Sequence, residues 1–115
     1  MLKDETIRRV VAFRDARNWR QFHTPKDLAL SLSLEAAEVL ELFQWSGGDL
    51  ECAGNRSRLR EELADVLSYC ILMADVCGFD LDEIMNEKVT KNEAKYPVEK
   101  AFGSAAKYTQ FTEDA

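Results

Sequence analysis

The sequence predicts an all-α fold of four to five helices that pack as a bundle. Two observations carry this prediction. Apolar residues recur at helical spacing, as Ile7, Val10 and Val11 do near the start of the chain. Residues that begin or end helices then divide the apolar pattern into segments of helical length. A chain of 115 residues is expected to form a single domain, 1–115, with a less regular C-terminal tail over about 98–115.

The first two helices are separated by the segment NWRQFHTP. The first helix is expected over about residues 4–18. Thr24 is expected to be the N-cap of the second helix and Pro25 its first residue, because Pro fits the first turn and Thr can accept a backbone hydrogen bond there. The second helix is expected to run to about Gln44. It is rich in Leu and Ala and is expected to be buried on several sides.

A loop containing three glycines, over 46–55, is expected to lead into the third helix. Ser57 is expected to cap that helix, which runs to about Val76 and is ended by Gly78. Asp80 with Glu83 resembles a capping box for a fourth helix. The pair Tyr96-Pro97 ends it, because the residue before Pro disfavours the helical region.

The composition argues against several classes of binding partner and location. The net charge of −6 disfavours binding to a nucleic-acid polymer. No apolar run approaches the ~20 residues that cross a membrane, and the charged start lacks the apolar core of a signal peptide. Three cysteines without paired spacing argue against a disulfide framework, so a cytoplasmic location is expected. Cys70 and Cys77 are expected to be core residues rather than ligands.

Four acidic residues form two pairs with a spacing of three, Glu35 with Glu38 and Glu62 with Asp65. Residues three apart lie on one face of a helix. Helix acids are usually solvated, but these pairs have apolar neighbours, and only Glu62 has a basic residue, Arg58, one turn away on its own helix. Carboxylates in that setting repel each other, and a hard cation such as Mg²⁺ or Mn²⁺ would relieve the repulsion. We therefore predict a metal site between the two helices.

Several longer motifs accompany the acidic pairs: RNWRQFHTPKDLALSL, EAAEVLELFQW, LREELADVLSYCILMADVCG, KVTKNEAKYP and AAKYT. Together they resemble the MazG-like nucleotide pyrophosphohydrolases of the all-α NTP pyrophosphatase superfamily, and within it the dCTP pyrophosphatases. The resemblance covers the chain from about Ile7 to Thr109. It implies a MazG-like bundle completed by homo-oligomerisation, with a tetramer favoured over a dimer.

The resemblance also implies an activity and a set of site residues. The activity is Mg²⁺-dependent hydrolysis of a dNTP, with dCTP or a related or modified dNTP favoured, to a dNMP and pyrophosphate by water attack at the α-phosphorus. The implied metal ligands are Glu35, Glu38, Glu62 and Asp65, and both Glu35 and Glu38 are candidates for orienting the water. The predicted substrate-binding residues are His23, Trp45, Tyr69, Lys88, Lys91, Asn92, Lys95, Tyr96, Lys107 and Tyr108.

Other interpretations of the same residues stay open. The same reaction could act on other bases. Alternatively, the chain could be a non-catalytic helical interaction module whose acids are vestigial or bind Ca²⁺ structurally. Taken without the resemblance, Lys88, Lys91 and Lys95 could complement the dipole of their helix, and His23 could serve as a cap. Trp19 and Phe22 are expected to lie in the core.

Overall fold

The computed structural model describes residues 2–110, and within this range the chain contains helices and no β-strand. The elements in chain order are α1 (Asp4–Ala16), the 3₁₀ turn η1 (Trp19–Phe22), α2 (Pro25–Glu41), the 3₁₀ turn η2 (Ala53–Asn55), α3 (Arg56–Cys77), α4 (Leu81–Lys95), α5 (Val98–Ala101) and the 3₁₀ turn η3 (Tyr108–Gln110). They form two compact units, Met1–Phe79 and Asp80–Ala115. The predicted all-α class is confirmed.

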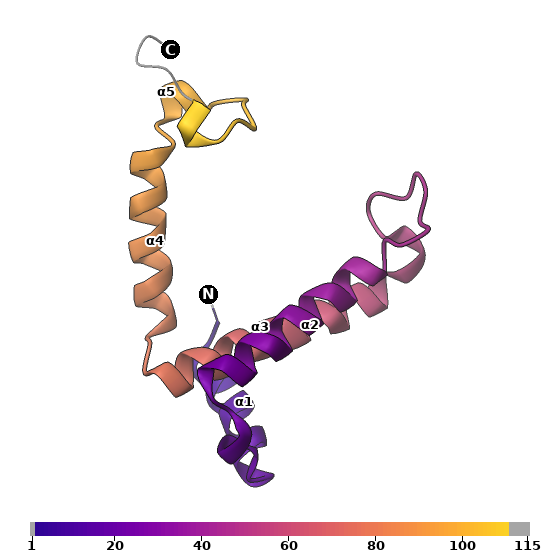
Figure 1. Cartoon of the computed structure of the whole chain (residues 1–115), viewed down its shortest axis with the longest axis vertical. Coiled ribbons are helices and arrows are strands. Elements are labelled where there is room, and N and C mark those ends of the chain that lie inside the picture. Colours follow the sequence, from indigo (N-terminus) through magenta and orange to yellow (C-terminus); the bar gives the residue numbers. More distant parts are fainter. Residues whose placement is uncertain (1, 111–115) are drawn as a thin grey trace. The chain divides into compact units, whose positions relative to one another are not determined.

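The first unit is built on a hairpin of α2 and α3, which lie side by side and antiparallel, with α1 packed against α3 (Figure 1). Leu28 near the start of α2 and Ile71 near the end of α3 are buried, as this antiparallel arrangement requires. Leu42 and Cys52 are buried at the other end, beside the connecting loop. Cys70 and Cys77, expected in the core, are half-buried.

Local capping explains where α2 begins and where α3 ends. The hydroxyl of Thr24 accepts a hydrogen bond from the backbone N–H of Asp27 at 3.1 Å, and Pro25 is the first residue of α2. Gly78 ends α3 with a φ of 70°, a left-handed conformation that glycine adopts without a Cβ clash. The backbone N–H of Phe79 then bonds to the carbonyl of Ala74 at 2.8 Å. The caps predicted at Thr24 and Gly78 are confirmed.

Two predicted boundaries differ from the structure. Ser57 does not cap α3, because the helix begins at Arg56 directly after η2, and its N-cap Asn55 makes no side-chain hydrogen bond. The second helix ends at Glu41 rather than about Gln44. The backbone keeps turning to Gln44 through bonds between residues three apart, and Trp45 then takes a left-handed φ of 65°.

The loop between α2 and α3 folds around one carboxylate. Asp49 accepts hydrogen bonds from the backbone N–H groups of Glu51, Ala53 and Gly54 at 3.3, 3.0 and 3.4 Å. These bonds, the one from Ala53 first, lower the pKa of Asp49, since they favour its charged form. A single side chain thus orders the turn that leads into η2.

The second unit contains α4, α5 and η3. Asp80 caps α4 by accepting a hydrogen bond from the backbone N–H of Glu83 at 2.9 Å, which confirms the predicted helix start. The helix ends at Lys95, just before Tyr96-Pro97 as predicted. The tail is less regular, with the short α5 and η3 as its only helical segments within the described range.

Candidate active site

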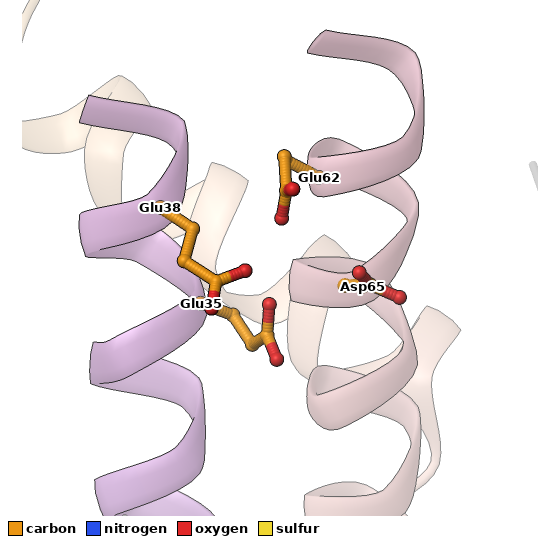
Figure 2. A group of neighbouring side chains, drawn as sticks. All are labelled: Glu35, Glu38, Glu62 and Asp65. Carbon is orange, nitrogen blue, oxygen red and sulfur yellow. The ribbon is translucent and has the colours of Figure 1, made fainter. Parts of the chain in front are cut away.

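The four predicted metal ligands lie together between α2 and α3. Glu35 and Glu38 lie on α2 and face the segment of α3 that carries Glu62 and Asp65 (Figure 2). Each residue offers one carboxylate oxygen, and these four oxygens lie within 4.8 Å of one another. The spacing of three within each helix and the antiparallel packing of the helices together produce this cluster.

The electrostatics of the cluster favour a bound cation. Oε2 of Glu35 and Oε2 of Glu62 are buried and have no hydrogen-bond partner. A hydrogen bond shared with Glu38, then burial, then the charges of Glu38 and Asp65 raise the pKa of Glu62, while Arg58 acts in the opposite direction. Nη2 of Arg58 lies 3.8 Å from Oε1, the other oxygen of the Glu62 carboxylate, which is too far for a hydrogen bond. A cation would satisfy both orphaned oxygens and offset the repulsion, so the donor set fits a hard divalent ion.

A pocket adjoins this cluster within the first unit. Its volume is about 480 Å³, and Asp65 belongs both to its lining and to the carboxylate cluster. Its remaining lining comes from α1, η1, α3 and the residue after η1. The lining residues are Thr6, Arg9, Val10, Phe13, Arg14, Trp19, His23, Ser68, Tyr69 and Leu72. Predicted site residues His23 and Tyr69 therefore share one cavity with a predicted metal ligand.

His23 brings a polar group with an unpartnered nitrogen to this pocket. Its Nδ1 is buried and has no hydrogen-bond partner. Burial first, and then the charges of Arg14 and Arg20, lower the pKa of His23, while Asp27 acts in the opposite direction. The neutral imidazole therefore persists to a lower pH than that of a free histidine, and it can either donate or accept a hydrogen bond.

Two aromatic residues of η1 differ from the sequence expectation. Trp19 and Phe22 do not belong to the core of the protomer, since they are 44% and 63% exposed. Trp19 instead lines the pocket and meets the ring of Phe13 edge to face at 5.7 Å between centroids. The aromatic residues before His23 were the one feature of the sequence that pointed to a pocket. Helical periodicity could not show that α1 and η1 form its wall. Phe13 and Arg14 were likewise not anticipated.

Trp45 is not part of this pocket. It is 92% exposed in the turn after α2. The protomer therefore brings His23 and Tyr69 together but leaves Trp45 apart, and the predicted contact of Trp45 with substrate stays a prediction.

The remaining predicted site residues lie in the second unit. Tyr96 and Tyr108 meet edge to face with ring centroids 5.9 Å apart, and Nζ of Lys95 lies 5.0 Å from the centre of the Tyr108 ring. Three of the predicted residues thus form one group. Lys88, Lys91, Asn92 and Lys107 are exposed, and the phosphate contacts predicted for this unit stay predictions.

Comparison with known proteins identifies the family. A model of the MazG-like family matches residues 30–111, which is more than half of the chain and includes all four clustered carboxylates. The chain belongs to the MazG-like family. The family match begins after His23, so it does not include the wall of the pocket that α1 and η1 provide.

Individual MazG-like relatives extend the similarity over nearly the whole chain. The chain is 42% identical to dCTP pyrophosphatase 1 of Mus musculus over 111 residues, which is 91% of this chain and 65% of the mouse protein. It is 40% identical to dCTP pyrophosphatase 1 of Homo sapiens over 117 residues, or 96% of this chain and 69% of the human protein. The chain thus spans about two thirds of the length of these curated relatives.

The fold is also similar to a solved structure. The crystal structure of a pyrophosphatase from Archaeoglobus fulgidus matches with a TM-score of 0.75 and 42% identity, and the match covers 82% of this chain and 91% of the other. A likeness of this extent supports the all-helical arrangement. None of the helices in the described part of the chain is long and apolar enough to cross a membrane.

Proposed function

We propose that this MazG-like protein is a nucleoside triphosphate pyrophosphohydrolase that converts a dNTP to a dNMP and pyrophosphate, with dCTP or a related or modified dNTP favoured. The observation that carries the proposal is the convergence of four carboxylates beside a pocket large enough for a base. Its similarity to dCTP pyrophosphatase 1 and to a solved pyrophosphatase supports it. We propose that the enzyme acts in the cytoplasm, where it controls the pool of free nucleotides.

The carboxylates would hold Mg²⁺, with Mn²⁺ as the alternative hard cation. When bound, such an ion would neutralise phosphate oxygens and so make the triphosphate open to attack. Glu35, Glu38, Glu62 and Asp65 would fix the ion, and Glu35 or Glu38 would orient a water molecule toward the α-phosphorus and accept its proton. Because its acidic neighbours raise the pKa of Glu62, a proton would compete with the ion for this carboxylate.

The pocket would receive the base. Phe13 and Trp19 provide aromatic surface, and His23 and Tyr69 provide polar groups at the same cavity. This combination is typical of ligand sites in which apolar surface supplies affinity and a few polar groups supply orientation. The phosphates would extend toward Asp65. In our proposal Lys88 and Lys91 supply positive charge to the phosphates, and Asn92 supplies a hydrogen bond.

The enzyme is proposed to be a homo-oligomer, with a tetramer favoured. Several large apolar side chains on the α2–α3 hairpin are exposed in the protomer, including Leu34 at 68% and Leu40 at 70%. Exposed apolar surface of this kind is typical of an interface. Self-association is the simplest way to cover a helical hairpin that one protomer leaves open.

The bond cleaved and the metal site can be tested together. In ¹⁸O-labelled water, the label should appear in the dNMP, because water attacks the α-phosphorus. Asp65→Ala should lose turnover while its helical circular dichroism remains, and Glu61→Ala, which changes the neighbouring exposed acid outside the cluster, should keep it. Label found only in pyrophosphate, or full activity in Asp65→Ala, would overturn the proposal.

A further inference from the structure

Arg14 is the only buried charged residue among residues 2–110, with 4% of its surface exposed. Its Nη1 lies 2.6 Å from Oδ2 of Asp75, and its Nε and Nη2 each lie 2.9 Å from Oδ1 of Asp15. The bond to Asp75 joins α1 to α3 across sixty-one residues of sequence. Burying a guanidinium is costly without such partners. Asp75 thus fixes a full positive charge at one place in the fold.

That place is the wall of the pocket. Arg14 lines the cavity together with His23, whose Nδ1 is buried and unpartnered. An orphaned buried nitrogen at a cavity is a position where a ligand can supply the missing hydrogen bond. The fixed charge of Arg14 also acts against a second positive charge on the imidazole.

We propose that Arg14 is a positioning residue for base recognition: held by Asp75 in the wall of the cavity that His23 also lines, it keeps the imidazole a hydrogen-bond acceptor for a base that carries an exocyclic amino group. A protonated imidazole can only donate, whereas a neutral one can also accept. Cytosine presents an amino donor at the position where thymine presents a carbonyl acceptor. This inference rests on the proposed function and assigns to Arg14 a part in the choice of base.

Other charged and titratable groups of the first unit also lie at the pocket and can affect the pKa of His23. The groups that line it or act on His23 are Arg9 and Arg14 from α1, Arg20 from η1, Asp27 from α2, and Asp65 and Tyr69 from α3. In residues 2–110, no hydrogen bond or ion pair joins His23 to a carboxylate of the metal cluster. The Arg14 variants leave all these other charges in place. A comparison with the wild type at one constant Mg²⁺ concentration therefore measures the effect of Arg14 on the pKa of His23.

The test uses the fact that His23 is the only histidine in the sequence, so that one imidazole signal can be followed by NMR as pH is changed. Arg14→Met should raise the pKa of His23. Asp75→Asn, which breaks the same ion pair but leaves the Arg14 charge in place, should not raise it. Arg8→Met, which removes a charge from an exposed position of α1 outside the pocket, should leave the titration unchanged. If Arg14 merely held α1 to α3, Arg14→Met and Asp75→Asn would have the same effect, and that result would overturn the proposal.

Kinetics supply the second readout. The ratio of kcat/KM for dCTP to that for dTTP should fall on acidification, and in Arg14→Met it should begin to fall at a higher pH than in the wild type. The loss of one hydrogen bond to the base corresponds to about a 2- to 10-fold change in this ratio. An unchanged pH dependence of the ratio in Arg14→Met would contradict the inference. If neither triphosphate were hydrolysed, the proposed function would fail, whereas the titration of His23 would still decide the role of the Arg14 charge.

Arg14→Gln is a second variant for the same test, to be used if Arg14→Met does not fold. Glutamine can still donate a hydrogen bond to Asp75 but carries no charge. The proposal requires the same upward shift of the His23 pKa in this variant. A wild-type titration in a folded Arg14→Gln protein would overturn it.

Discussion

Glu62 combines an orphaned buried oxygen with a raised pKa, chiefly because it shares a hydrogen bond with Glu38. The folded metal-free protein therefore binds a proton at Glu62 more readily than the unfolded chain does. Such a group lowers stability at neutral pH, and the lost stability returns as pH falls through the raised pKa. Glu62→Gln should therefore raise the melting temperature of the metal-free protein at neutral pH, and this advantage should shrink on acidification.

Thermal unfolding in chelator and in excess Mg²⁺ checks this prediction. Mg²⁺ should stabilise the wild type more than Glu62→Gln, because the ion binds only the folded site and loses a charged ligand in the variant. Glu61→Gln removes an acid from the adjacent, exposed position and is the matched control. Equal melting temperatures for the two variants in chelator would show that Glu62 is not strained by its neighbours.

Trp19 should contribute to nucleotide affinity, because its ring lines the pocket. Stacking of a base on an aromatic ring is worth about 1–3 kcal/mol, so Trp19→Ala should raise KM by roughly 5- to 150-fold. The value of kcat should change less, since stacking is similar in the ground and transition states. Phe22→Ala, from the same 3₁₀ turn but outside the pocket, should leave KM near the wild-type value.

Trp45 can be tested in the same assay. The sequence predicts that Trp45 binds substrate, whereas its ring is exposed and outside the pocket of its own protomer. A raised KM would therefore mean that Trp45 reaches a nucleotide bound by another copy. A wild-type KM would remove it from the site.

At the scale of helices and turns, Gly78 shows how one backbone conformation ends α3. Its φ of 70° is unfavourable for residues with a Cβ, and a Cβ there would meet no atom within 4 Å, so strain alone decides the effect of a substitution. Gly78→Ala should lower the free energy of unfolding by about 1–2 kcal/mol. Urea unfolding checks this value. Gly48→Ala is the control, because Gly48 has equally open surroundings without the left-handed φ, and it should be neutral or slightly stabilising.

Helix boundaries were predictable where short-range chemistry decides them. Thr24, Gly78 and Asp80 act within four residues of their own position, so sequence patterns predicted all three. Ser57 failed because η2 leads straight into α3, and the start of that helix depends on the preceding loop. The carboxylate cluster was predictable because helical spacing places each pair on one face.

The pocket was harder to predict, because it depends on how α1 packs against α3. Periodicity along α1 gives no sign that Arg14 reaches Asp75, sixty-one residues later in the chain. The same contact decides which aromatic rings face a cavity. Trp19 therefore looked like a core residue until its neighbours in space were known.

For the whole molecule, the exposed leucines on the α2–α3 hairpin predict assembly. Sedimentation at micromolar concentration should give a species larger than the 13.1 kDa protomer, with a mass near four times that value favoured. Leu34→Glu should shift the distribution to smaller species, because burying an unpaired charge in an interface is costly. Lys26→Glu, an exposed and polar position of the same helix, is the control for the change in charge. A fully active monomer would contradict this prediction.

The loop between α2 and α3, which Asp49 orders, is a place where the chain can accept insertions in evolution. The two helices hold the carboxylates in place through their own contact, and the turn after α2 adds no ligand to the cluster. Lengthening such a connection costs little chain entropy, about 0.6 kcal/mol for each doubling of its length. Insertions between Ser46 and Asn55 should therefore leave the catalytic geometry intact. This end of the hairpin is where the protein can gain new segments while it keeps its chemistry.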